Sequence, residues 1–316
     1  MLDHSASFIN RRQVLQGIAI STLGALLPVT TFATEEKSAA VSFGFSLYGM
    51  KSVATTDAFR ILNRIGYDAV ELVCMPDWST APESLSREER TQIKQELERL
   101  NLQLPALMEN LPLLVSAEQR QKHLDRIKAA GELGHDLSPE KPPVLETIMG
   151  GKPDDWPAVK NEMVEELGRW ADAAEACQTV LAVKPHVSGA VHAPDSADWL
   201  IQQVNSPWIR LAYDYSHYQI RDYDFEKSLD RLLPHSVFIH VKDNLGTDGK
   251  VQFALPGEGN IDYPTYFKAL KKHHYRGTVM VEVSSQLWRK DGYDPVAAAK
   301  TSFANLKPIL RSAGLA

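Results

Sequence analysis

The stretch "RLAYDYSHYQ", residues 210–219, joins an apolar run to a polar end. Leu211, Ala212 and Tyr213 are suited to a buried strand, and Asp214 and His217 follow them. A carboxylate and an imidazole buried at the end of such a strand are destabilising unless each has a partner. The stretch therefore predicts a buried strand whose carboxyl end takes part in a site.

The same pattern recurs along the chain, where short apolar runs alternate with segments of helical spacing. The runs that predict strands are residues 41–47, 68–73, 102–108, 143–148, 179–184, 209–214, 237–242 and 277–283. The segments that predict helices are residues 55–66, 86–101, 117–133, 157–176, 195–204, 225–233, 263–273 and 294–312.

This alternation predicts an α/β fold, a closed (β/α)8 TIM barrel. Near-continuous apolar runs are typical of parallel strands that are covered on both faces, and about eight strand–helix units close such a barrel. A doubly wound open sheet is the alternative. That fold usually has a glycine-rich phosphate turn after its first strand, and "SLYGMKS" (46–52) is not such a turn.

The composition favours one domain over residues 41–312. Hydrophobic residues make up 44% of the 316, and no linker divides the chain. The formal net charge is −6 and no long basic run appears, so we expect no nucleic-acid partner. Cys74 and Cys177 lie far apart without metal-site spacing, and we expect both to be small buried residues.

The N-terminal stretch "NRRQVLQG" (10–17) places Arg11 and Arg12 before a short uncharged run, residues 18–33. This stretch resembles a twin-arginine export signal, although Asn10 and Val14 depart from the usual pattern. We therefore expect residues 1–33 to be a signal peptide, and the protein to be periplasmic or secreted without a stable membrane span. An uncleaved tether or an unstructured tail is the alternative.

Titratable residues stand at the carboxyl ends of seven of the expected strands. In barrels of this kind these ends meet at one face, where function collects. The residues are Glu71, Glu109, Glu146, Lys184, His186, Asp214, His217, His240, Lys242 and Glu282.

Three of them form a candidate metal site: Asp214, His240 and Glu282 follow three consecutive strands. Two carboxylates and an imidazole suit one divalent ion, such as Mn²⁺, Mg²⁺, Fe²⁺, Co²⁺ or Zn²⁺. Each residue also has a structural alternative. Asp214 could cap a helix, His240 could be a hydrogen-bonded core residue, and Glu282 could pair with Lys242.

Five motifs resemble the sugar phosphate isomerase/epimerase family, which has the xylose isomerase-like barrel. They are "GYDAVEL" (66–72), "DYSH" (214–217), "HVKD" (240–243), "GEGNID" (257–262) and "VEVS" (281–284). The resemblance implies one divalent metal held by Asp214, His240, Glu282 and a further glutamate on the fifth strand. It also implies that Glu282 transfers a proton and that His217 contacts a sugar oxygen.

The chain departs from this family at the fifth strand, where "AVKPHVSG" (182–189) has Lys184 in place of the glutamate. Three arrangements are open. Lys184 could pair with Glu146, it could be a neutral, desolvated base, or His186 could supply the fourth metal ligand. We keep Lys184 beside Glu282 as a catalytic candidate and favour the neutral base.

Other polar and aromatic residues near the strand ends are candidates for holding a carbohydrate. Besides His217, they are His186, Lys242, Glu109, Trp288 and Arg289. Trp288 and Arg289 could equally be solvent-facing loop residues. In "GEGNID" we expect Asp262 to cap the helix that follows.

These observations together predict a metal-dependent enzyme of the sugar isomerase/epimerase kind, with a small-molecule carbohydrate as its partner. It would remove a proton next to a carbonyl and pass through an enediolate. A lyase or hydrolase that eliminates from a 3-keto-glycoside is the first alternative, and a non-catalytic sugar-binding barrel is the second. The oligomeric state is left open.

Overall fold

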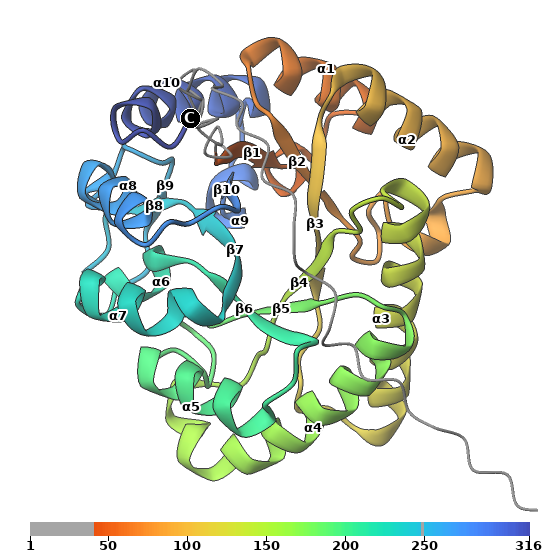
Figure 1. Cartoon of the computed structure of the whole chain (residues 1–316), viewed down its shortest axis with the longest axis vertical. Helices are drawn as coiled ribbons and strands as arrows, with labels where there is room; N and C mark the ends of the chain where they lie inside the picture. The colour runs from red at the N-terminus through yellow and green to blue at the C-terminus, as the bar shows by residue number, and fades with distance from the viewer. Residues whose placement is uncertain (1–40, 248–249) are drawn as a thin grey trace, which may run out of the picture. The chain divides into compact units, whose positions relative to one another are not determined.

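The computed structural model describes residues 41–247 and 250–316 and confirms the (β/α)8 barrel (Figure 1). The predicted signal peptide lies outside these residues. The parallel strands close in the order β1-β10-β7-β6-β5-β4-β3-β2. Their bounds are β1 Ser42–Ser46, β2 Ala69–Val73, β3 Gln103–Asn110, β4 Val144–Ile148, β5 Leu181–Lys184, β6 Ile209–Tyr213, β7 Ser236–Val241 and β10 Thr278–Val281.

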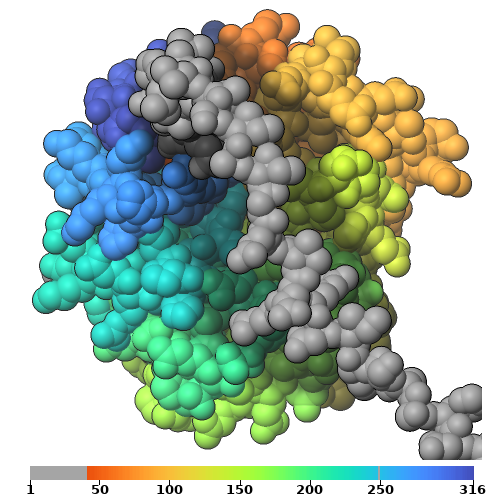
Figure 2. Space-filling view, viewed as in Figure 1, coloured from red at the N-terminus to blue at the C-terminus, as the bar shows by residue number. Residues whose placement is uncertain are grey.

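Helices surround the barrel, and their side chains form its outer wall in the space-filling view (Figure 2). They are α1 Thr55–Ile65, α2 Arg87–Leu100, α3 Ala117–Leu137, α4 Trp156–Ala176, α5 Pro194–Val204, α7 Phe225–Leu232, α8 Tyr263–Lys272 and α10 Pro295–Ser312. Local capping sets several of these bounds. Ser86 and Glu89 form a capping box at α2, and Asp262 accepts from Thr265 N at α8, as predicted. Of the described helices, none is both long and apolar enough to cross a bilayer.

Short elements that the sequence analysis did not predict follow β6, β7 and β10. They are α6 Tyr215–Gln219, α9 Ser285–Trp288 and the hairpin of β8 Asp243–Asn244 with β9 Phe253–Ala254. The 3-10 turns are Leu47–Met50, Pro82–Ser84, Pro153–Asp155 and Leu233–His235. Such elements are too short to produce a periodic pattern.

The hairpin and the "GEGNID" loop are tied together by Asp243, whose carboxylate accepts from the backbone N–H groups of Asn244, Gly257 and Ile261 at 2.9–3.0 Å. A Cβ at Gly259 would lie 2.3 Å from Asp243 Oδ1. The glycine therefore permits the close approach of the loop to this carboxylate.

The interior of the barrel contains an apolar layer of side chains. Its residues are Ala69, Ala106, Ala182, Ala212, Phe238 and Met280, and Val144 packs against them. Side chains alternate along a strand, so the residues two positions further on also face the interior. This alternation brings a second layer, which we call the charged layer, to the carboxyl end of the barrel: Glu71, Glu146, Lys184, Asp214, His240 and Glu282.

Candidate active site

The charged layer is almost completely removed from water. Its most exposed member, Glu282, has 8% of its surface accessible. Lys242, two residues beyond His240, is also buried. Buried charges are tolerated only when they are paired and hydrogen-bonded, so their contacts define the site.

Two ammonium groups connect the three residues of the candidate metal site. Lys242 Nζ lies 2.6 Å from Asp214 Oδ2 and 2.9 Å from Glu282 Oε2. Lys184 Nζ lies 2.9 Å from the same Glu282 oxygen and 3.2 Å from His240 Nδ1. Glu282 Oε2 is therefore the shared acceptor at the middle of the site.

Glu146 supports Lys184 from the other side, because its Oε1 lies 3.0 Å from Lys184 Nζ. Burial lowers the pKa of Lys184, but Glu146 and Glu282 outweigh it and hold this pKa well above its ordinary value. Of the three arrangements expected for Lys184, the structure therefore has the Glu146 pair. It does not favour a neutral amine.

The carboxylate at the middle is held ionised. Burial raises the pKa of Glu282, but Lys184 and Lys242 dominate and hold it well below the usual range. Burial raises the pKa of Glu146. The two glutamates beside Lys184 thus differ in basicity, because Glu282 has a second ammonium partner.

His240 is oriented by a residue from the far side of the barrel. Its Nε2 lies 3.0 Å from Glu71 Oε2, and both side chains are fully buried. This contact directs Nδ1 toward Glu282 and Lys184. Sequence reasoning placed Glu71 at a strand end but missed this role, for which the alternation along β2 was the available signal.

Two imidazole rings in tilted contact lie next to the charged layer. The rings of His186 and His217 are 4.1 Å apart, and Phe253 contacts His217 edge-on. Within the described chain neither ring nitrogen of His217 makes a hydrogen bond, although Nε2 lies 3.5 Å from Asp214 Oδ2. Burial and Lys242 lower the pKa values of both, that of His186 to about 4, so both rings are neutral.

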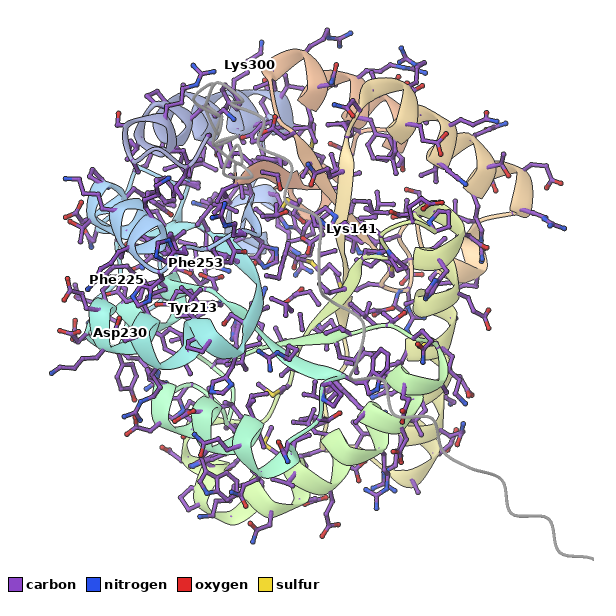
Figure 3. The ribbon with its side chains drawn as sticks, in the orientation of Figure 1. Lys141, Tyr213, Phe225, Asp230, Phe253 and Lys300 are labelled. Carbon is purple, nitrogen blue, oxygen red and sulfur yellow. The ribbon has the colours of Figure 1, made fainter. Side chains whose placement is uncertain are left out.

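Phe253, from the unpredicted hairpin, also contacts the centre from the other direction. Its ring centroid lies 5.2 Å from Lys242 Nζ, within the range of a cation–π contact. Figure 3 labels Phe253 and Tyr213 on this side of the barrel. Tyr213, the last residue of β6, bonds to Ser228 Oγ of α7 and so faces the helices, whereas Asp214 faces the interior.

The structure does not bring Glu109 to the centre. Glu109 follows the interior residue Met108 and so faces α3, where it forms an ion pair with Arg126. The expectation that it binds substrate does not fit this position. Strand β3 continues to Asn110, so the strand end had been placed too early.

The aromatic candidates gather in a separate cluster. Tyr48, Trp78 and Trp288 contact one another at centroid distances of 5.3–6.2 Å, and Arg289 lies 5.0 Å from the Trp288 ring. The ring and cation–π contacts of this cluster within the described residues do not include the three candidate ligands. The Trp288 and Arg289 roles therefore stay predictions.

Asp214, His240 and Glu282 could hold a metal ion, because each offers a ligand atom within 4.8 Å of the others. A second group, Glu71, Glu146 and His240, meets the same criterion. Among the described residues His186 joins neither group, and its Nδ1 lies 2.8 Å from Ser188 Oγ.

The donor atoms fit a divalent ion by type, but their surroundings do not. All three residues already contact a lysine Nζ at 2.6–3.2 Å. A divalent ion at the same place would lie beside two ammonium groups, and like charges at such distances repel strongly in a buried site. As arranged here, the lysines fill the position that a metal would take.

Comparison with known proteins shows the family. A profile of the xylose isomerase-like TIM barrel family matches residues 59–309, and the chain belongs to this family. A stretch of 145 residues is 28% identical to the L-ribulose-5-phosphate 3-epimerase UlaE of Salmonella paratyphi B, covering 46% of this chain and 49% of that protein. The match thus spans about half the length of this curated relative.

Solved structures show the same fold. IolI, whose structure contains a bound zinc atom, has a TM-score of 0.72 at 17% identity and covers 86% of this chain and 99% of its own. The probable 3-DHS dehydratase AsbF of Bacillus anthracis has a TM-score of 0.70 at 16% identity, with coverages of 84% and 99%.

Proposed function

We propose that the chain is a carbohydrate-directed enzyme of the isomerase/epimerase kind, which moves a proton on a carbon next to a carbonyl. The observation that carries the proposal is the placement of Glu282 Oε2 at 2.9 Å from both Lys184 Nζ and Lys242 Nζ in a buried centre. An ionised carboxylate can accept a proton, and adjacent cations stabilise the oxyanion that forms.

The roles follow from this arrangement. Glu282 takes the proton from the carbon, and the electron pair of the C–H bond moves through the new C=C bond onto the carbonyl oxygen. Positive charge at the centre stabilises the resulting enediolate, and His217 binds a sugar oxygen through its free ring nitrogens. Return of the proton from Glu282 to the neighbouring carbon, with the hydroxyl proton moving between the two oxygens, gives an isomer, whereas protonation of the opposite face by a second donor gives an epimer.

The positive charge has two possible sources. One is the ammonium pair of Lys184 and Lys242. The other is a single divalent ion held by Asp214, His240 and Glu282 after both lysines move aside, for which the zinc in IolI is the precedent. When bound, such an ion would polarise the carbonyl oxygen.

An elimination is the second candidate reaction. Lys184 is an ammonium group beside the same carboxylate, so it can protonate a leaving oxygen after Glu282 has taken a proton. This acid–base pair fits elimination from a 3-keto-glycoside, and the dehydratase name of AsbF is consistent with it. A non-catalytic sugar-binding barrel is less well supported, because binding alone does not require so many buried charges.

Hydrogen exchange tests the function without knowledge of the product. Free sugars, ketoses and 3-keto-glycosides are incubated with the full chain in D₂O, and deuterium incorporation and product masses are measured. We expect one class to exchange a single C–H, with loss of this exchange in Glu282→Gln and not in Glu258→Gln, which changes an exposed glutamate. Binding of a sugar with no exchange and no product would support the binding protein instead.

We also propose that the protein is exported by the twin-arginine route. The support is the Arg11–Arg12 pair ahead of an uncharged run, which lies outside the described residues. Replacing both arginines with lysine should leave a precursor in the cytoplasm, whereas the parent should yield a mature protein that begins near residue 34. Unchanged export of the lysine variant would contradict this route.

A further inference from the structure

The three candidate metal ligands are bridged to one another by lysine ammonium groups. Lys242 Nζ bridges Asp214 and Glu282, and Lys184 Nζ bridges Glu282 and His240. The two ammonium groups meet at one oxygen, Glu282 Oε2. A metal ion needs this same carboxylate, so ion and lysines compete for it.

Each ammonium group also has a contact on the side away from Glu282. Glu146 Oε1 lies 3.0 Å from Lys184 Nζ, and the Phe253 ring lies 5.2 Å from Lys242 Nζ. The side chains of Lys184 and Lys242 are 3% and 2% exposed. Neither can leave the centre for water without a movement of its neighbours, which makes their displacement by an ion unfavourable.

The carboxylates of the centre already have basic neighbours. Four buried carboxylates, those of Glu71, Glu146, Asp214 and Glu282, face two ammonium groups and the imidazole of His240. A divalent ion added with both lysines retained would place a third cation beside Glu282, and cations that close together repel strongly in a buried site.

We propose that the ammonium groups of Lys184 and Lys242 are the resident cations of this centre and that they exclude a divalent ion from it. This inference rests on the proposed function for its catalytic meaning: the lysines, in place of a metal, donate hydrogen bonds to the oxygens of the enediolate. In the isomerase/epimerase reaction the two lysines form no covalent bond with the substrate and keep their protons.

Metal content tests the inference independently of any substrate. The full chain and its variants are dialysed separately against Mn²⁺ and Zn²⁺, and the bound metal is measured by elemental analysis and titration calorimetry. We expect the parent to retain no stoichiometric ion. We expect a Lys184→Met, Lys242→Met double variant to bind one ion per chain at least about 100-fold more tightly.

Two further variants locate the effect. Adding Asp214→Asn to the double variant should abolish the new binding. Lys307→Met is the matched control, because Lys307 is a largely buried lysine that pairs with Asp68 away from the centre, and it should bind no more metal than the parent. Circular dichroism and thermal melting confirm that each variant is folded.

One ion per chain in the parent, lost on Asp214→Asn, would overturn the inference, as would a folded double variant that binds no more metal than the parent. If the double variant does not fold, the inference is judged on the metal content of the parent, which should hold no stoichiometric ion. The metal measurements do not depend on turnover. Failure to find a substrate would count against the proposed function, and the metal content would still test whether the lysines exclude an ion.

Discussion

The apolar layer and the charged layer come from the same strands, with two positions between their members, except at β3, where Met108 follows Ala106. On β6 the pair is Ala212 and Asp214, and on β5 it is Ala182 and Lys184. Both layers are buried, yet one consists of methyl, thioether and phenyl groups and the other of carboxyl, amino and imidazole groups. Burial therefore does not select apolar residues at this end of the barrel, because the charges there pair with one another.

This difference separates stability from function in one scaffold. The apolar layer needs no partner outside itself, whereas each member of the charged layer depends on residues that come from other strands. A substitution in the first layer should act on folding, and one in the second on the reaction.

The largest loss of stability should come from placing a charged side chain in the apolar layer. Ala212→Asp would bury a carboxylate among Ala182, Phe238 and Met280, none of which can pair with a negative charge. We expect little or no folded protein, measured by circular dichroism and soluble yield. Ala212→Ser, which adds a polar atom but no charge, is the control and should fold. A stable Ala212→Asp protein would show that the apolar layer tolerates charge.

Neutralising the middle of the charged layer should remove the reaction and preserve the barrel. In Glu282→Gln the proton acceptor is lost and both lysines lose their shared partner. We expect turnover of a substrate found by exchange to fall by about 10³. The far-ultraviolet circular dichroism should stay unchanged. Full turnover would remove Glu282 from the mechanism.

Removing one lysine should have a smaller effect. Lys184→Met keeps the length of the side chain, and turnover should fall by about 10² because one cation at the oxyanion is lost. Glu146→Gln serves as the comparison, since it removes the support of Lys184 and leaves its ammonium group in place.

Equal kinetic defects in Lys184→Met and Glu146→Gln would mean that the ion pair is only structural. Lys184→Glu sharpens the distinction, since it supplies the carboxylate found in the resembling family. We expect it to bind metal and to lose the native reaction. Unchanged turnover in Lys184→Glu would exclude a catalytic role for Lys184.

The smallest effect concerns pH. The pKa of His186 is lowered by burial to about 4, from 6.5 for a free histidine. Between these values the unfolded chain binds a proton that the folded chain does not, so stability falls as the pH falls from 6.5 toward 4. The free energy of unfolding, measured with denaturant at several pH values, should depend less steeply on pH in His186→Phe than in the parent. An identical slope would mean that His186 is not responsible.

The sequence by itself determined the barrel and most of the residues at its carboxyl end. Strand and helix patterns are local, and eight such units leave few ways to close a sheet. Capping is also local, which is why the roles of Ser86, Glu89 and Asp262 could be predicted. Asp214, His240, Lys184 and Glu282 were found because each ends an apolar run.

Only the tertiary structure decided which of these charges pair. The contact between Glu71 and His240 joins residues 169 positions apart, and the one between Lys184 and Glu282 joins residues 98 positions apart. The positions of strand ends indicate which residues lie at the centre. They do not indicate which carboxylate each long lysine side chain pairs with there. Glu109 shows a second limit of sequence-based prediction. Neighbouring residues on a strand face opposite sides of the sheet, so an error of one residue moves a side chain from the interior of the barrel to its exterior. The choice between interior and exterior, and between metal and ammonium, therefore depends on the register and closure of the barrel.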